Sequence, residues 1–204
     1  MKIDFNLLNS VKGFMDEDEA KQLYSTAFKA SENGPVLEIG SYCGKSAYII
    51  GCACQQQSSI LFSIDHHKGS EEQQPGEEYY DHDLFDSKLS RVNTFPFFLQ
   101  TIAQARLENT VVPIVAPSTV AGKMWKTPIS MLFIDGGHSF DAAYEDFLTW
   151  GCHIQPNGFL VIHDIFFDPD KGGQAPRQVY EIAIATGDYE EVEMTKTLGV
   201  LKRK

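Results

Sequence analysis

Short apolar runs recur along the chain and are bounded by turn-forming residues. They lack the polar alternation of half-exposed strands, which is typical of strands that a sheet buries on both faces. Five runs predict strands, at residues 36–40, 59–64, 111–115, 129–134 and 159–162. Between them, apolar residues three and four positions apart predict helices. One helix follows the acidic turn at 14–19, and the others span residues 45–53, 99–107, 140–150 and 177–185.

The order of these elements predicts the topology of the sheet. Strands that alternate with helical crossovers lie parallel in a doubly wound sheet. The last two predicted strands, Tyr189–Met194 and Gly199–Lys202, are joined by Thr195-Lys196-Thr197, which is short enough to permit only an antiparallel hairpin. No internal repeat or linker divides residues 1–204. We therefore expect a single α/β domain with a mostly parallel, Rossmann-like sheet and a C-terminal antiparallel hairpin.

Residues 66–98 form the least regular segment, which is rich in Gln, Glu, Tyr, Asp and His. The segment follows the second predicted strand, at the end of the sheet where open α/β folds bind ligands. This position predicts a substrate lid, and a surface loop that touches no ligand is the alternative. Its histidines His66, His67 and His82 show no ligand spacing and are expected to be solvent-exposed.

Composition narrows the class of partner. The formal net charge of -11 disfavours a general affinity for nucleic acid or for an anionic membrane. There is no signal pattern at the N-terminus and no apolar run of the roughly 18 residues that span a membrane, so we expect a cytoplasmic protein with a small-molecule partner. The four scattered cysteines indicate reduced packing residues. The apolar arm Met1–Gly13 could cover a second copy, which leaves a homo-oligomer open.

A glycine-containing loop follows the first predicted strand. Gly40 and Gly44 let the backbone turn sharply before the next helix. The stretch Glu38–Ser46 is neither the dinucleotide fingerprint G-x-G-x-x-G nor a P-loop. Its pattern Glu-x-Gly-x-x-x-Gly resembles motif I of class I S-adenosylmethionine-dependent methyltransferases. That family has a seven-stranded sheet ending in an antiparallel hairpin, so the resemblance extends beyond this loop.

The resemblance implies S-adenosylmethionine as cofactor. Asp65, which ends the second predicted strand, would accept hydrogen bonds from the two ribose hydroxyls, and capping of the following turn is its alternative role. Gly40 and Gly44 would line the methionine half, Glu38 would order the loop or contact the amino group, and Ser118 occupies the adenine position. The implied cofactor-binding residues are Glu38, Gly40, Ser41, Tyr42, Gly44, Ser46, Asp65, Ser118 and Asp135.

Two further strand ends carry chemistry. Asp135-Gly-Gly-His138 and His163-Asp164 resemble the branch with macrolide sugar O-methyltransferases and the related proteins known as cephalosporin hydroxylases. The resemblance implies a divalent cation, usually magnesium, on Asp135 and Asp164, and His138 as the base. His163 stands where relatives have a second acid, which would favour a cation that accepts imidazole. The alternatives are that no metal binds, or that Asp135 and His138 serve only packing.

These residues predict an S-adenosylmethionine-dependent methyltransferase that acts on a hydroxyl group of a small molecule. The predicted catalytic residues are His138 and Asp135, and the predicted metal ligands are Asp135, His163 and Asp164. Two other classes remain as alternatives: a nicotinamide-dependent oxidoreductase, and a cofactor-binding protein without transferase activity. The acceptor cannot be inferred, because the segment that would select it is the one with the least regular pattern.

Overall fold

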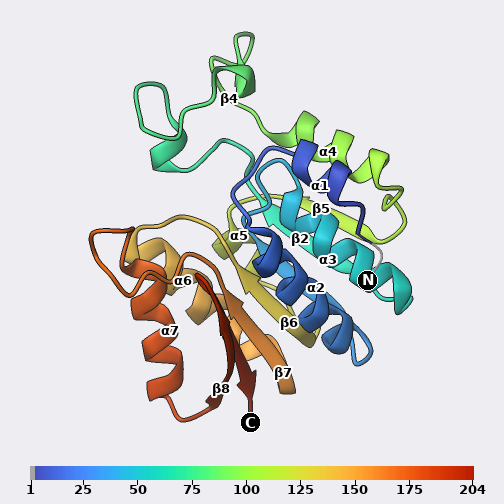
Figure 1. Ribbon diagram of the computed structural model, residues 1–204, viewed down its shortest axis with the longest axis vertical. Coiled ribbons are helices and arrows are strands. Elements are labelled where there is room, and N and C mark those ends of the chain that lie inside the picture. Colours follow the sequence, from blue (N-terminus) through green and yellow to red (C-terminus); the bar gives the residue numbers. More distant parts are fainter. Residues whose placement is uncertain (1–2) are drawn as a thin grey trace.

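The computed structural model describes residues 3–204 and contains a seven-stranded sheet in the order β5-β2-β1-β6-β7-β9-β8 (Figure 1). Strands β5, β2, β1, β6 and β7 are parallel, and β9 pairs antiparallel with both β7 and β8. The predicted fold class is therefore confirmed. The strands are β1 (Val36–Ile39), β2 (Leu61–Asp65), β5 (Val111–Val115), β6 (Ile129–Ile134), β7 (Ile154–Ile162), β8 (Tyr189–Thr195) and β9 (Leu198–Arg203).

Helices cover both faces of the sheet (Figure 1). One core, which includes Leu23, Ile49 and Phe98, lies under the first four helices. The other, which includes Leu132 and Trp150, lies under the last three. The first set comprises α1 (Phe5–Ser10), α2 (Glu17–Ser31), α3 (Lys45–Gln56) and α4 (Phe95–Gln104); the second comprises α5 (Ser118–Gly122), α6 (Phe140–Trp150) and α7 (Ala175–Ala185). Burial of strand side chains on both sides explains why their runs are almost wholly apolar.

Two elements, β7 and α4, begin at least four residues earlier than the sequence pattern predicts. Strand β7 starts at Ile154 rather than Phe159, and its first residue pairs with Ile129 before a shift in register. The polar residues Gln155 and Asn157 interrupt the apolar run and concealed this part of the strand. Helix α4 starts at Phe95 rather than Leu99, with Pro96 in its first turn, where proline is well tolerated.

Most of the N-terminal arm packs on its own chain. Leu8 of α1 is only 1% exposed and belongs to the first core, and the amide of Asp4 donates to the Tyr48 hydroxyl at 2.8 Å. Met1 and Lys2 lie outside the described residues. Contacts of the arm with a second copy therefore stay a prediction. Of the cysteines, Cys152 alone is exposed, whereas Cys43 is buried and so are Cys52 and Cys54.

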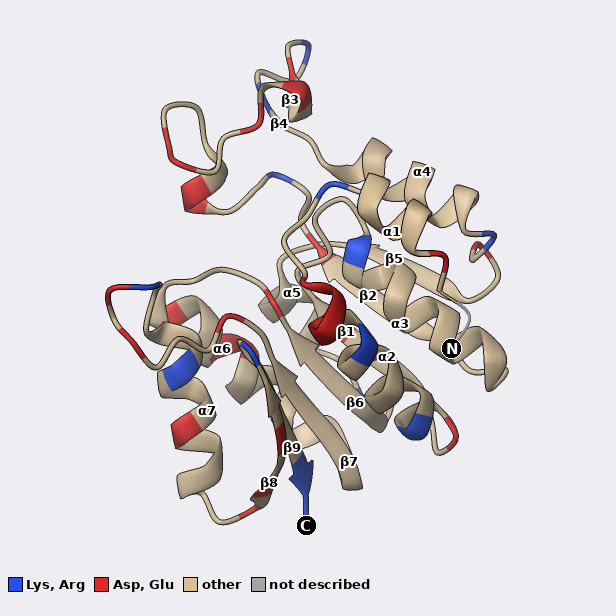
Figure 2. Cartoon of the chain, in the orientation of Figure 1, with Lys and Arg blue, Asp and Glu red and all other residues tan. Residues whose placement is uncertain are grey.

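Residues 66–94, called the cover below, leave the carboxyl end of β2 and return at α4. The cover projects beyond the end of the sheet (Figure 1) and contains two 3-10 turns and a short ribbon. Its elements are η1 (Glu71–Gln73), η2 (His82–Leu84), β3 (Phe85–Asp86) and β4 (Arg91–Val92). Acidic side chains occur along the cover and at the start of α2 (Figure 2). Within residues 3–204, no helix combines the length and apolar character needed to cross a membrane.

Candidate active site

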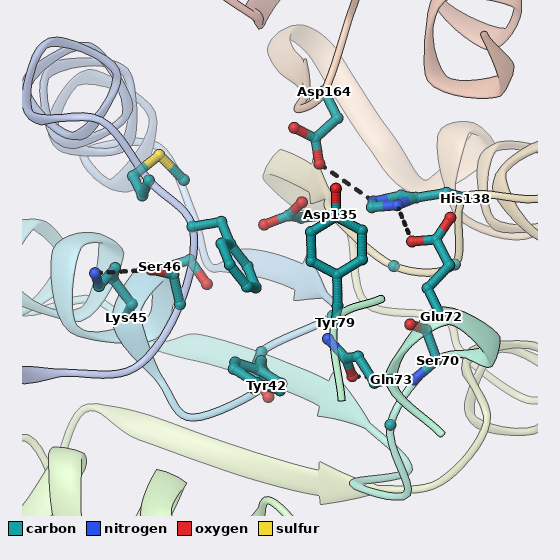
Figure 3. Close-up of a pocket in the computed structure, with 18 of the residues that line it drawn as sticks. Tyr42, Lys45, Ser46, Ser70, Glu72, Gln73, Tyr79, Asp135, His138 and Asp164 are labelled. Carbon is teal, nitrogen blue, oxygen red and sulfur yellow. Dashed lines mark hydrogen bonds and ion pairs between the residues drawn. The ribbon is translucent and has the colours of Figure 1, made fainter. Parts of the chain in front are cut away.

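A cavity of about 400 Å³ lies at the carboxyl ends of the parallel strands, beneath the cover. Its wall combines the loop after β1 and the loop after β6, which carry Tyr42 and His138 (Figure 3). Asp65 at the end of β2 and Lys12–Met15 ahead of α2 also line it. The sequence-predicted residues that line it are Gly40, Ser41, Tyr42, Ser46, Asp65, Asp135, His138 and Asp164. Four others do not line this cavity: Glu38, Gly44, Ser118 and His163.

Gly40 brings two of these loops into contact. Its φ of +87° lies in the left-handed region, and a Cβ there would stand 2.0 Å from the carbonyl oxygen of Asp135. Glycine is therefore required by the neighbouring strand end, and not only by the approach of a ligand. Any side chain at this position would displace the Asp135 backbone and the loop after β1 together.

Asp65 holds the loop after β1 and the turn after β2. One carboxylate oxygen accepts from the amides of Ser41 at 3.0 Å and Tyr42 at 2.8 Å, and the other accepts from the His67 amide at 2.7 Å. Asp65 thus caps the following turn while it also lines the cavity. A carboxylate offers about four acceptor positions, so capacity remains for a ligand hydroxyl.

Two buried polar atoms lie beneath or beside the loop after β1. Glu38 is fully buried and accepts a 2.6 Å hydrogen bond from Ser63, and burial raises its pKa to about 8, so the carboxyl is protonated at neutral pH. Within the described chain, Glu38 Oε2 and Ser41 Oγ have no hydrogen-bond partner. Because buried polar groups usually have partners, the unsatisfied hydroxyl of Ser41, a cavity-lining residue, suits a polar ligand held by this loop.

Ser118 is engaged elsewhere. It begins α5, and its hydroxyl hydrogen-bonds to the buried carboxyl of Asp146 on α6. Burial raises the pKa of Asp146 to about 6. In this structure Ser118 therefore connects two helices outside the cavity, and its predicted contact with adenine stays a prediction.

Asp135, His138 and Asp164 form a cluster in the wall of the cavity. Each residue offers one atom that could bind a metal ion, and these three atoms lie within 4.8 Å of one another. His138 Nε2 is 3.2 Å from Asp164 Oδ2, and its Nδ1 is 3.0 Å from Glu72 Oε2 of the cover (Figure 3). The hydrogen bond with Asp164, aided by Glu72, raises the pKa of His138 to about 9 despite partial burial. With a φ of +58°, Asp164 adopts a backbone conformation that aspartate tolerates better than most residues.

His163 lies in the interior between carboxylates, and its predicted role as a metal ligand stays a prediction. The side chain is 3% exposed, with Nδ1 3.2 Å from Asp135 Oδ1 and Nε2 3.2 Å from Glu19 Oε2. Burial lowers the pKa of His163, but the flanking carboxylates outweigh burial and raise it well above the ordinary value. His163 lies outside the cluster of Asp135, His138 and Asp164, and it does not line the cavity. The geometry therefore favours His138 over His163 as the imidazole nearest a bound ion.

The sequence analysis did not identify Glu19 as the partner of His163. It closes the capping box at the start of α2, and its carboxylate also accepts from the amide and hydroxyl of Thr197, at 2.9 and 2.7 Å. Burial raises the pKa of Glu19, but the hydrogen bonds from His163 and Thr197 prevail and lower it to about 2. The capping pattern signals where a helix begins, but it contains no information about partners in segments far away in the sequence.

His67 contradicts the expectation of a solvent-exposed loop residue. It is 3% exposed, its Nδ1 is 2.7 Å from Thr94 Oγ1, and its ring packs against Phe95 and Phe98. His67 has a φ of +56°, in the left-handed region, and its ring lies at the base of the cover. Glu72 and Tyr79, which also line the cavity, were likewise not singled out from the sequence.

Comparison with known proteins now identifies the family. Residues 37–165, more than half of the chain, match the model of a methyltransferase domain. This chain belongs to that methyltransferase family. The predicted methyltransferase class is therefore confirmed, and the match favours it over the nicotinamide-dependent alternative.

Solved structures of O-methyltransferases have the same fold as this methyltransferase. The O-methyltransferase from Bacillus cereus in complex with SAH is 15% identical, with a TM-score of 0.65 over 100% of this chain and 93% of that chain. TomG from Streptomyces achromogenes, an O-methyltransferase of tomaymycin synthesis in complex with SAM, is 16% identical, with a TM-score of 0.63 over 93% of this chain and 81% of that chain. At this identity the likeness extends to the fold.

Proposed function

We propose that this methyltransferase transfers the methyl group of S-adenosylmethionine to a hydroxyl oxygen of a small molecule. The observation that carries the proposal is that one cavity joins the glycine-containing loop after β1 to the cluster of Asp135, His138 and Asp164. The first is suited to the cofactor and the second to the acceptor. Solved neighbours of the same fold hold SAM or SAH, which supports the choice of cofactor.

The cofactor side would use residues that already line the cavity. Ser41 has a buried hydroxyl without a partner in the described residues, and Asp65 has remaining acceptor capacity near the loop. Tyr42 and Ser46 complete this wall. Glu38 acts from below the loop, because it is fully buried and does not reach the cavity.

Methyl transfer then requires removal of one proton. The acceptor oxygen forms a bond to the methyl carbon as the carbon–sulfur bond breaks, and the electron pair of that bond remains on sulfur in S-adenosylhomocysteine. The hydroxyl proton moves to His138 Nε2, which must first be neutral and released from Asp164. Glu72 remains at Nδ1 and keeps the ring in place.

Asp135 and Asp164 would hold a divalent cation. His138 is close enough to be a third ligand, and in that case it would not be the base. Oxygen ligands suit magnesium or manganese, and an imidazole suits manganese better than magnesium. When bound, such a cation lowers the pKa of a coordinated hydroxyl. Asp164 would then turn from His138 to the cation, which leaves Nε2 free to accept the proton.

Calorimetric titration with S-adenosylhomocysteine, with and without magnesium and manganese, tests the cofactor and the cation separately. We expect binding without either cation, because Ser41 and Asp65 are distinct from the carboxylates of Asp135 and Asp164. Turnover with a panel of hydroxyl acceptors should be abolished by a chelator while S-adenosylhomocysteine still binds. Binding without any turnover would instead support the alternative of a cofactor-binding protein without transferase activity.

A further inference from the structure

Glu72 connects the cover directly to His138. Its Oε2 lies 3.0 Å from His138 Nδ1, although the two residues are 66 positions apart in the sequence. Glu72 belongs to η1, whereas His138 lies in the loop after β6, so the contact spans the wall of the cavity (Figure 3). The Glu72 side chain is 47% exposed and that of His138 is 34% exposed. The contact is therefore at the rim, where movement of the cover would separate the two residues.

The position of Glu72 depends on how the rest of the cover is held. Its carbonyl oxygen accepts from the Tyr79 amide at 3.1 Å, and the Tyr79 ring packs edge-on against Phe14 at 5.6 Å between centroids. Lys12 pairs with Asp81 and, at 2.9 Å, with Asp83. These contacts join the cover to the segment ahead of α2. They fix Glu72 above His138 only while the cover lies over the cavity.

A carboxylate at Nδ1 also determines which nitrogen of a neutral imidazole carries the proton. When the ring is neutral and Asp164 has moved away, an Nδ1–H group that donates to Glu72 leaves the lone pair on Nε2. Nε2 is the nitrogen that approaches Asp164 in the cavity wall. Without Glu72, the ring could rotate or carry its proton on Nε2, and it could not then accept a proton from a substrate hydroxyl.

We propose that Glu72 is a positioning residue that couples closure of the cover to the orientation of His138. The proposal rests on the proposed function, in which His138 Nε2 accepts the hydroxyl proton. Lifting of the cover for ligand entry withdraws Glu72, and closure restores it. His138 is then in its productive orientation only when the cavity is covered and bulk water is excluded.

Three variants test the coupling. Glu72→Ala should lower kcat about 10–100-fold, the range for loss of a carboxylate that orients a metal-binding histidine through its other ring nitrogen, with acceptor KM and S-adenosylhomocysteine affinity within about twofold of wild type. Glu72→Gln should recover part of this loss, because its amide oxygen can still accept from Nδ1. Glu71→Ala, an exposed neighbour in η1, is the matched control and should retain kcat. An equal loss in the control, or a loss confined to KM, would overturn the proposal.

A double variant shows whether Glu72 acts through His138. In a His138→Ala background, Glu72→Ala should cause no further loss of kcat, because the group that it orients is absent. Independent, additive losses would instead mean that Glu72 acts on the substrate. A second pair, Asp81→Asn with Asp83→Asn, loosens the cover at residues that do not line the cavity. It should also lower kcat, and an unchanged kcat despite a loosened cover would overturn the coupling.

Amide hydrogen exchange in residues 69–84 gives a readout that does not require activity. Glu72→Ala and His138→Ala should both speed exchange there, and Glu71→Ala should not. If no acceptor is methylated by the wild type, the proposed function fails, but this measurement still decides whether the Glu72–His138 contact holds the cover. Unchanged exchange in Glu72→Ala would overturn that part of the proposal.

Discussion

His138 and His163 follow adjacent parallel strands, and both ring nitrogens of each histidine lie near a carboxylate. Asp164 is also 3.6 Å from His163 Nδ1. The nitrogen-to-oxygen distances are similar: 3.0 and 3.2 Å at His138, and 3.2 Å on both sides of His163. The exposure of the two side chains is not similar, at 34% for His138 and 3% for His163. The same pair of interactions therefore occurs once at the rim of the cavity and once in the interior.

The partners explain why this difference matters. Glu19, the outer partner of His163, belongs to a helix that packs on the core, whereas Glu72 belongs to the cover. A buried ion pair is costly to separate because neither charge can be solvated, and at the rim water can replace either partner. We infer that His163 supports the fold around Asp135, and that His138 can exchange partners during a reaction.

The largest expected effect is on stability, in His163→Leu. The substitution leaves Glu19 buried without its cationic partner and should reduce the free energy of unfolding by about 3–5 kcal/mol. Urea unfolding followed by circular dichroism measures this loss. His82→Leu, at an exposed position of the cover, should change stability little. Adding Glu19→Leu should recover part of the loss because it removes the buried, unpaired charge of Glu19, although Asp135 still lacks its partner. Equal stability of His163→Leu and His82→Leu would remove the contrast between His163 and His138.

His138→Ala should show the opposite profile. Methyl transfer should slow on the order of 10²- to 10⁴-fold, the usual span for loss of a general base, while unfolding free energy changes by less than about 1 kcal/mol. Single-turnover kinetics and calorimetry with manganese separate the two roles of the ring. Retained cation affinity supports the base, and lost affinity makes His138 a ligand. A fully active variant would mean that the loop from Asp135 to His138 is only a turn.

Acid should weaken the interior pair. The pKa of Glu19 falls from 4.5 to about 2 in the folded protein because the hydrogen bonds from His163 and Thr197 outweigh the effect of burial. The folded state thus binds fewer protons than the unfolded state, so this contribution is complete above pH 4.5 and is lost as the pH falls toward 2. Its size is on the order of 3 kcal/mol. Unfolding at pH 6 and pH 3 should show a flatter dependence for Glu19→Gln than for wild type, while the exposed control Glu17→Gln follows wild type.

Mild alkali should weaken the His138–Asp164 pair at the rim, and we expect this loss of stability to be the smallest of the four effects. Hydrogen bonding to Asp164 raises the pKa of His138 from 6.5 to about 9, so its contribution is complete below pH 6.5 and is lost as the pH rises through 9. Solvent screening makes this contribution smaller than that of Glu19. Melting temperatures at pH 7 and pH 10, with chelator present, should fall more for wild type than for His138→Gln. A fall as large as the one that acid causes through Glu19 would show that the rim is not screened.

The sequence predicted the fold well because each strand and helix contains its own periodic signal. Helix α6 was predicted with both ends correct, and Ser139, which caps it, immediately precedes that helix. The start of β7 was missed because Gln155 and Asn157 broke its apolar run. His67 was assigned to solvent because a reversal of the backbone at one residue has no periodic signature.

The pattern along the chain was enough to predict the parallel sheet with its antiparallel end, and it placed Asp65, Asp135, His138 and Asp164 after strands whose ends face one cavity. Parallel strands bring their carboxyl ends together, so the local pattern was enough to group these residues. The partners of the two histidines became visible only in the folded chain. His163 meets Glu19 across 144 residues and His138 meets Glu72 across 66, and contacts between segments so far apart leave no local pattern in either one. These partners then set the chemistry: in the interior, Asp135 and Glu19 outweigh burial and raise the pKa of His163 well above its ordinary value, whereas at the rim water can replace either partner of His138.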